Sequence, residues 1–132
     1  MDLEYYLEEI NFEKQLNRLN RRLKNKKVII YGTGLLFQLI NEKFDLSNLN
    51  IIAVSDRKYT PEDEGKEEFG YKIVPMVKMP DYHPDYVLVA TLNYIDIIDN
   101  FENTFFKGEK TKIRPLAQKG FWALLKEIWN LK

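Results

Sequence analysis

The chain has 132 residues, and its 20 basic and 20 acidic side chains cancel to a formal net charge of zero. This length allows one domain with a substantial core, but not a dinucleotide-binding unit followed by a separate substrate domain. The balanced charge gives no overall field that would favour nucleic acid or a membrane surface. Cysteine is absent, which excludes disulfides and thiolate chemistry and is typical of a reducing compartment. No apolar run approaches the roughly 20 residues of a membrane span, so we expect a cytoplasmic protein.

The first 24 residues are rich in charge, yet their apolar side chains recur every three or four positions. This spacing predicts an amphipathic helix with a break near Asn11. Basic side chains gather at its end: Arg18, Arg21, Arg22, Lys24, Lys26 and Lys27. They complement the negative end of the helix dipole, and a site for an acidic partner or RNA is the alternative. The basic run lacks interleaved aromatic side chains, so nucleic acid is not expected as a partner.

The stretch that follows carries the strongest signal in the chain. Residues 28–31 are apolar without polar alternation, which is typical of a central parallel strand buried on both faces. Two glycines break this strand, and residues 35–43 then show helical periodicity. A strand, a Gly-x-Gly turn and a helix open a dinucleotide-binding unit, in which free main-chain N–H groups hold a phosphate. The candidate cofactor contacts here are Gly32, Thr33, Gly34, Leu35 and Leu36.

A second buried strand, Leu49 to Val54, ends at an acidic residue. Asp56 lies 22 residues beyond Gly34, close to where a dinucleotide fold places the acid that accepts hydrogen bonds from a ribose. Acids also commonly end strands and start turns, so this structural role stays open. Arg57 and Lys58 are able to receive a phosphate on that ribose, but the Asp56 carboxylate would repel it. We therefore expect NAD rather than NADP.

The rest of the chain alternates between strands and helices. Residues 57–70 form a charged loop without the periodicity of a crossover helix, and two prolines between residues 76 and 84 leave room only for a helical turn. The further predicted elements are a short strand at 71–74, a buried strand at 85–91, a helix from Tyr94 to about Phe106 that Asn93 can cap, a strand at 111–115 and an apolar helix at 120–131.

This alternation predicts an α/β fold with a mainly parallel sheet and amphipathic helices at both termini. We expect the strand order 3-2-1-4-5, counted along the chain. Ligands bind such sheets at the carboxyl ends of the strands, where the order reverses. The predicted crevice is formed by residues 32–36, 56–58 and 91–94, which adds Thr91 and Asn93 to the candidate contacts.

Four segments, 28–34, 53–56, 69–75 and 85–90, resemble a small Rossmann-type, three-layer domain family of bacterial surface-polysaccharide and sugar-modification pathways. Such domains are similar to the N-terminal portion of nucleoside-diphosphate-sugar epimerases and dehydratases. The resemblance implies that Gly32, Thr33, Gly34 and Asp56 contact NAD or a nucleoside-diphosphate sugar. We accordingly divide the chain into an N-terminal amphipathic helix, residues 1–25, and a Rossmann-like nucleotide-binding domain with a C-terminal helix, residues 26–132.

The chain also departs from that family. Phe37 stands where a third glycine normally lets the helix pack closely on the strand. The active enzymes carry a tyrosine followed four residues later by lysine, and none of the eight tyrosines here has this spacing. We therefore expect a binding domain without a recognisable catalytic apparatus. The alternatives are a non-catalytic regulatory subunit with a degenerate pocket, and part of a dehydratase or epimerase that a partner completes; whether the chain is an enzyme stays open.

Two remaining features have structural and functional interpretations. His83 and the acidic residues of the 57–70 loop are expected on the surface, without a metal site. Trp122 and Trp129 are seven residues apart and share one helical face. They either pack in the core or form an interface for a homodimer or a partner enzyme through the terminal helices.

Overall fold

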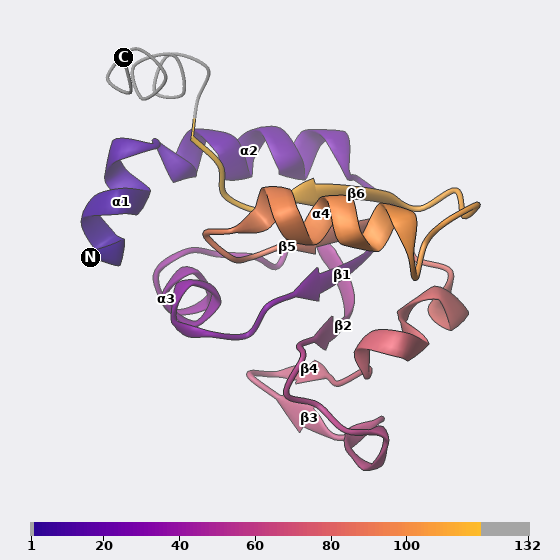
Figure 1. Cartoon of the computed structure of the whole chain (residues 1–132). Coiled ribbons are helices and arrows are strands. Elements are labelled where there is room, and N and C mark those ends of the chain that lie inside the picture. The colour runs from indigo at the N-terminus through magenta and orange to yellow at the C-terminus, as the bar shows by residue number, and fades with distance from the viewer. Residues whose placement is uncertain (1, 120–132) are drawn as a thin grey trace.

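A four-stranded parallel sheet forms the centre of the computed structural model, which describes residues 2–119. Its strands are β1 (Lys27–Tyr31), β2 (Asn50–Ser55), β5 (Tyr86–Val89) and β6 (Lys112–Pro115). They lie in the order β2-β1-β5-β6, and each neighbouring pair is parallel (Figure 1). The expected α/β class with a parallel sheet is therefore confirmed, while the predicted terminal helix at 120–131 lies outside the described residues.

The central strand β1 is buried on both faces, as its apolar run predicts. Val28 and Ile30 contribute to the hydrophobic cluster on one face, and Ile29 and Tyr31 to the cluster on the other. The register against β2 shifts between Val28 and Ile29, which pair with Ile51 and Ala53, so β2 contains one extra residue in this pairing.

The predicted five-strand order 3-2-1-4-5 is wrong for this sheet, because the segment 71–74 is not one of its strands. β4 (Tyr71–Lys72) pairs antiparallel with β3 (Glu67–Glu68), and only a single parallel bridge joins Ile73 to Val54. The Ile73 amide is bonded to the Lys66 carbonyl at 2.7 Å, which leaves the Val74 amide to reach Val54 at 2.9 Å. Pro75 then has no N–H to extend the pairing.

Three helices cover one face of the sheet. α1 (Leu3–Glu9), α2 (Phe12–Arg22) and α3 (Leu35–Lys43) contribute to the same cluster as Val28 and Ile30. The helical segment is interrupted between α1 and α2 at Asn11, whose backbone is left-handed with a φ of 52°. This confirms the predicted break in the amphipathic N-terminal segment, and Figure 1 shows the two helices in succession along one side of the molecule.

The other face is covered by α4 (Tyr94–Asn103) and by the 3₁₀ helix η2 (Met76–Tyr82). Phe101 of α4 packs edge-on against Tyr31 of β1, with ring centroids 4.7 Å apart. The expected loop at 57–70 contains no α-helix; it holds the short 3₁₀ helix η1 (Pro61–Asp63) and β3. Figure 1 shows the β3–β4 hairpin at the end of the molecule opposite α1 and α2.

Phe37 connects α3 to this hairpin. Its side chain is fully buried, and its ring centroid lies 6.0 Å from that of Phe69 and 6.2 Å from that of Tyr71. The residue in the third-glycine position therefore packs on the segment that takes the place of a crossover helix. This contact fixes the hairpin beside the end of β2.

Phe37→Ala should lower the free energy of unfolding by about 3–5 kcal/mol, because it leaves a cavity between α3 and the hairpin. Leu35→Ala is the matched control two residues earlier in the same helix. Its side chain is 74% exposed, so we expect a change within about 0.5 kcal/mol. Urea denaturation followed by circular dichroism measures both; equal effects would contradict this packing.

Candidate functional site

The turn after β1 requires glycine at Gly32 for two reasons. The φ of this residue is 103°, which L side chains rarely adopt. A Cβ atom here would also lie 2.8 Å from Thr91 Cγ2 and 3.2 Å from the Ala90 carbonyl oxygen. The Gly32 amide donates to the Ser55 carbonyl at 2.9 Å. Gly32 thus joins the carboxyl ends of β1, β2 and β5.

The space at the missing Cβ position is open at Gly34, whereas it is crowded at Gly32. Gly34 occupies the N-cap position of α3 with a φ of −80°, and apart from its chain neighbours no residue has a heavy atom within 4 Å of the position of its missing Cβ. No side chain caps the helix, so the first N–H groups, including those of Leu35 and Leu36, have no partner within the helix. The Leu36 side chain is buried and the Leu35 side chain is exposed. The positive end of the helix dipole therefore meets accessible backbone.

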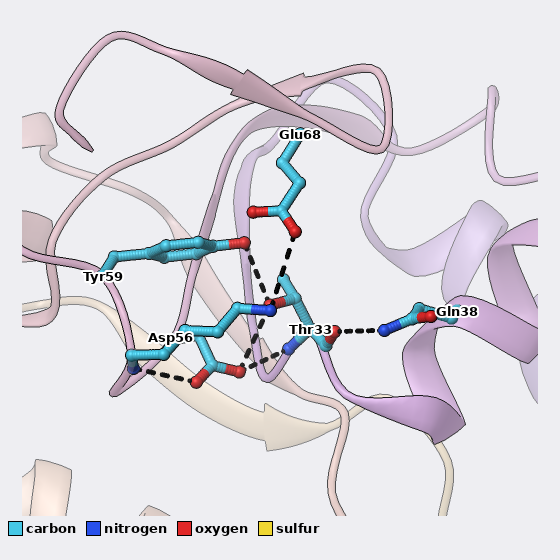
Figure 2. A network of polar contacts seen from close by, with 6 residues as sticks. Thr33, Gln38, Asp56, Tyr59 and Glu68 are labelled. Atoms are coloured by element: carbon cyan, nitrogen blue, oxygen red, sulfur yellow. Dashed lines mark hydrogen bonds and ion pairs between the residues drawn. The ribbon is translucent and has the colours of Figure 1, made fainter.

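Thr33, between the two glycines, is fully buried and bonded within the protein. Its amide donates to Asp56 Oδ2 at 2.7 Å, and its hydroxyl lies 3.3 Å from the same oxygen and 3.0 Å from the Tyr59 hydroxyl. Its carbonyl accepts from Gln38 Nε2 at 3.0 Å. Figure 2 shows Thr33 between Asp56 and Gln38, with Tyr59 and Glu68 on the side of the hairpin.

Asp56 directly follows β2, and its side chain accepts hydrogen bonds from the turn after β1. In addition to the two bonds from Thr33 to Oδ2, its Oδ1 accepts from the Lys58 amide at 3.1 Å. The carboxylate is half-buried and Arg57 beside it is exposed. A carboxylate offers about four acceptor positions, so these three bonds leave one for a ligand hydroxyl.

Tyr59 links the site to the hairpin. Burial is the main cause that raises the pKa of its phenol to about 12, with the neighbouring Glu68 and Asp56 adding to the rise against a lowering hydrogen bond from Thr33. Lys58 Nζ lies 5.4 Å from the centroid of the Tyr59 ring and 3.6 Å from Glu68 Oε1. The phenol is therefore neutral near pH 7 and acts as a hydrogen-bonding group.

The end of β5 adds the third wall of the candidate site. Among residues 2–119, the buried hydroxyl oxygens of Ser55 and Thr91 are without hydrogen-bond partners, and these residues flank Gly32 on its two sides. Asn93 is exposed at the N-cap position of α4, but its side chain makes no capping bond. Of these three polar side chains only that of Asn93 is exposed to a bound molecule, because the Ser55 and Thr91 hydroxyls are buried.

The structure brings most of the predicted contacts to one edge of the sheet. Gly32 touches Thr91, and Thr33 bonds to Asp56. Leu35 and Leu36 begin the helix at this edge, whereas Arg57 and Asn93 lie on the exposed loops around it. Sequence analysis missed Tyr59, Gln38 and Ser55; an aromatic residue three positions after Asp56, in a loop of charged residues, was the available signal for Tyr59.

The other candidates lie apart from this edge. His83 is exposed at the end of η2, and its backbone is left-handed with a φ of 49°.

Within the described range, no three histidine or acidic side chains are gathered to hold a metal ion. None of the helices described there has the length and apolar character needed to span a bilayer.

These features define an α/β protein in which a parallel strand passes through a Gly-x-Gly turn into a helix, beside an acidic residue that closes the next strand. The family model described as C2185-like, N-terminal, matches residues 24–112. The match covers more than half of the chain and includes the turn, Asp56 and Thr91, so the chain belongs to this family. A comparison with curated proteins found no match.

Alanine at the two glycines should have opposite consequences. Gly32→Ala should destabilise the protein by more than about 1 kcal/mol, because its φ and its contact with Thr91 both oppose a Cβ. Gly34→Ala should be neutral or stabilise by up to about 1 kcal/mol, because its conformation is ordinary and the space is open. Thermal and urea unfolding measure the difference; equal destabilisation would contradict the geometry of the turn.

Stability should fall as the pH rises from about 10 to about 12, partly through Tyr59. The folded state raises the pKa of this phenol above its ordinary value of 10.0, so its contribution is complete below pH 10 and is lost as the pH passes the folded value. Tyr59→Phe should reduce the fall, whereas Tyr5→Phe, at a ring that is 63% exposed, should not. Urea unfolding of the wild type and both variants across this pH range measures the fall in stability. A dependence of stability on pH that is unchanged in Tyr59→Phe would contradict the role of the Tyr59 contact.

Proposed function

We propose that the chain is a Rossmann-like binding domain for a nucleotide-type ligand, NAD in the first place and a nucleoside-diphosphate sugar in the second, in bacterial sugar or surface-polysaccharide metabolism. The observation that carries the proposal is the open backbone at Gly34, at the uncapped start of α3. Uncapped helix N-termini bind phosphate groups through their N–H groups and the helix dipole.

In this proposal the phosphates of the ligand bind over Gly34. The main-chain N–H groups of Leu35 and Leu36 donate to them, while the buried Leu36 side chain anchors the first turn. The Thr33 amide is not among these donors, because it is bonded to Asp56 at 2.7 Å.

The ribose of the ligand binds at Asp56, through its remaining acceptor position. A negative charge here disfavours a phosphate on the same ribose, so NAD is preferred to NADP. The exposed Arg57 beside the carboxylate contacts the ligand from the loop side.

A specific observation favours a second candidate, a non-catalytic regulatory or interaction subunit with a degenerate pocket. The Thr33 amide and hydroxyl already donate hydrogen bonds to the Asp56 carboxylate, and the buried Phe37 stands where a third glycine is expected. In that case Asp56 is a structural group alone, and the chain acts through its surface.

Calorimetric titration with NAD, NADH, NADP and a panel of nucleoside-diphosphate sugars separates the two candidates. We expect one of these to bind in the micromolar range. Gly34→Val should abolish binding by filling the space over the turn, while Leu35→Ala should preserve it, because only the backbone of Leu35 is used. Asp56→Asn should weaken NAD binding about tenfold through loss of a charge-assisted bond. It should also reduce the ratio of NAD affinity to NADP affinity, because the negative charge that disfavours the NADP phosphate is removed.

Binding weaker than millimolar for every compound would contradict the proposal and favour the regulatory candidate. Equal binding to wild type and to Gly34→Val would show that the ligand lies elsewhere. Each variant is first compared with wild type by circular dichroism, so that loss of binding is not confused with loss of fold.

A further inference from the structure

A cavity lies between α2 and the edge strand β6, away from the Gly-x-Gly turn. It has a volume of about 200 Å³ and adjoins a smaller one of about 50 Å³ that shares several of its residues. Two arginines, Arg22 of α2 and Arg114 of β6, line the larger cavity, and Arg18 lines the smaller. Apolar and aromatic side chains, including Leu23, Leu88 and Tyr86, complete the larger one.

The described residues give this cavity a positive charge. Neither lining contains a carboxylate, and within residues 2–119 no acidic side chain forms an ion pair with Arg18, Arg22 or Arg114. Lys112 adds a fourth positive charge, with its Nζ 6.0 Å from the centroid of the Tyr86 ring. Like charges brought together repel, and a bound anion would relieve this repulsion.

The sign of the charge is specific to this place. A cavity of about 410 Å³ between α1, α2 and the end of α3 is lined by Glu4, Glu8 and Glu13 together with Lys43. The zero net charge of the chain therefore conceals an acidic cavity near the start of α2 and a basic cavity near its end.

Protection of the sheet edge explains only part of the basic cavity. β6 is an edge strand of the four-stranded sheet, and Lys112, Arg114 and Pro115 on it discourage pairing with another chain. Arg18 and Arg22 come from α2 and have no part in that protection. The helix dipole favours basic side chains at the end of α2, but neither it nor edge protection explains why Arg22 and Arg114 line the same cavity.

We propose that this cavity binds a small phosphate-bearing molecule, with Arg22 and Arg114 holding the phosphate and Arg18 at the rim. The planar guanidinium group matches phosphate oxygens in a two-bond geometry that lysine cannot provide. The volume of about 200 Å³ accommodates a phosphate with a small organic group, which packs on the Tyr86 ring. This site is independent of the proposed nucleotide site at Gly34.

Calorimetric titration of the full chain with inorganic pyrophosphate and with glycerol 3-phosphate tests the proposal. Arg22→Gln and Arg114→Gln should each weaken binding about tenfold, and the double variant should abolish it. Arg21→Gln is the matched control, because Arg21 is an exposed neighbour on α2 outside both linings. All three side chains are exposed, so the variants should unfold at the wild-type temperature.

Gly34→Val keeps this test separate from the proposed nucleotide site. Phosphate binding that persists in Gly34→Val and is lost in the double arginine variant supports the proposal, whatever the outcome with NAD. Binding lost in Gly34→Val and retained in the double variant would overturn it, since the phosphate would then lie at the start of α3. An equal loss in Arg21→Gln, no binding in wild type, or binding only to vesicles of phosphatidic acid and phosphatidylcholine would overturn it as well.

Discussion

The hydrogen bonds from Thr33 to the Asp56 carboxylate are the interactions on which the candidate site depends. They join the turn after β1 to the end of β2, and the shorter of them, from a fully buried amide, measures 2.7 Å. A buried main-chain N–H without an acceptor is costly, so Asp56 determines the conformation of the whole Gly-x-Gly turn. Gly32 completes the arrangement by allowing Thr91 and the end of β5 to approach from the other side. The result is a rigid support that leaves the backbone at Gly34 open.

The same bonds divide the work within the turn. Thr33 is bonded within the protein, while in our proposal Gly34 and the first N–H groups of α3 bind the ligand. Asp56 has both roles in our proposal, since a carboxylate already held by three donors is positioned before a ribose arrives. Such positioning reduces the ordering that binding must impose. It also explains why the structural and ligand-binding interpretations of Asp56 do not exclude each other.

The sequence predicts the sheet better than it predicts the surroundings of the site. The apolar runs that became β1, β2 and β5 are long and buried on both faces, so their pattern alone indicates a parallel sheet. The segment 71–74 also contains β-branched and aromatic residues, but its bond to Lys66 and the following proline leave it in a hairpin with one bridge to Val54. The positions of Gly32, Gly34 and Asp56 followed from their spacing. The contacts of Tyr59 could not be predicted from the sequence. Tyr59 lies in a charged loop without periodicity, and its hydrogen-bond partner Thr33 is 26 residues away in the chain.

The central claim is that a nucleotide-type ligand approaches the backbone at Gly34, at the start of α3. The most direct test is the change in backbone amide chemical shifts when NAD or a nucleoside-diphosphate sugar is added to the ¹⁵N-labelled protein. We predict the largest changes at Gly34, Leu35 and Leu36, with smaller ones at Asp56 and Thr91. Shifts confined to other parts of the chain, or no shifts at millimolar ligand, would contradict it.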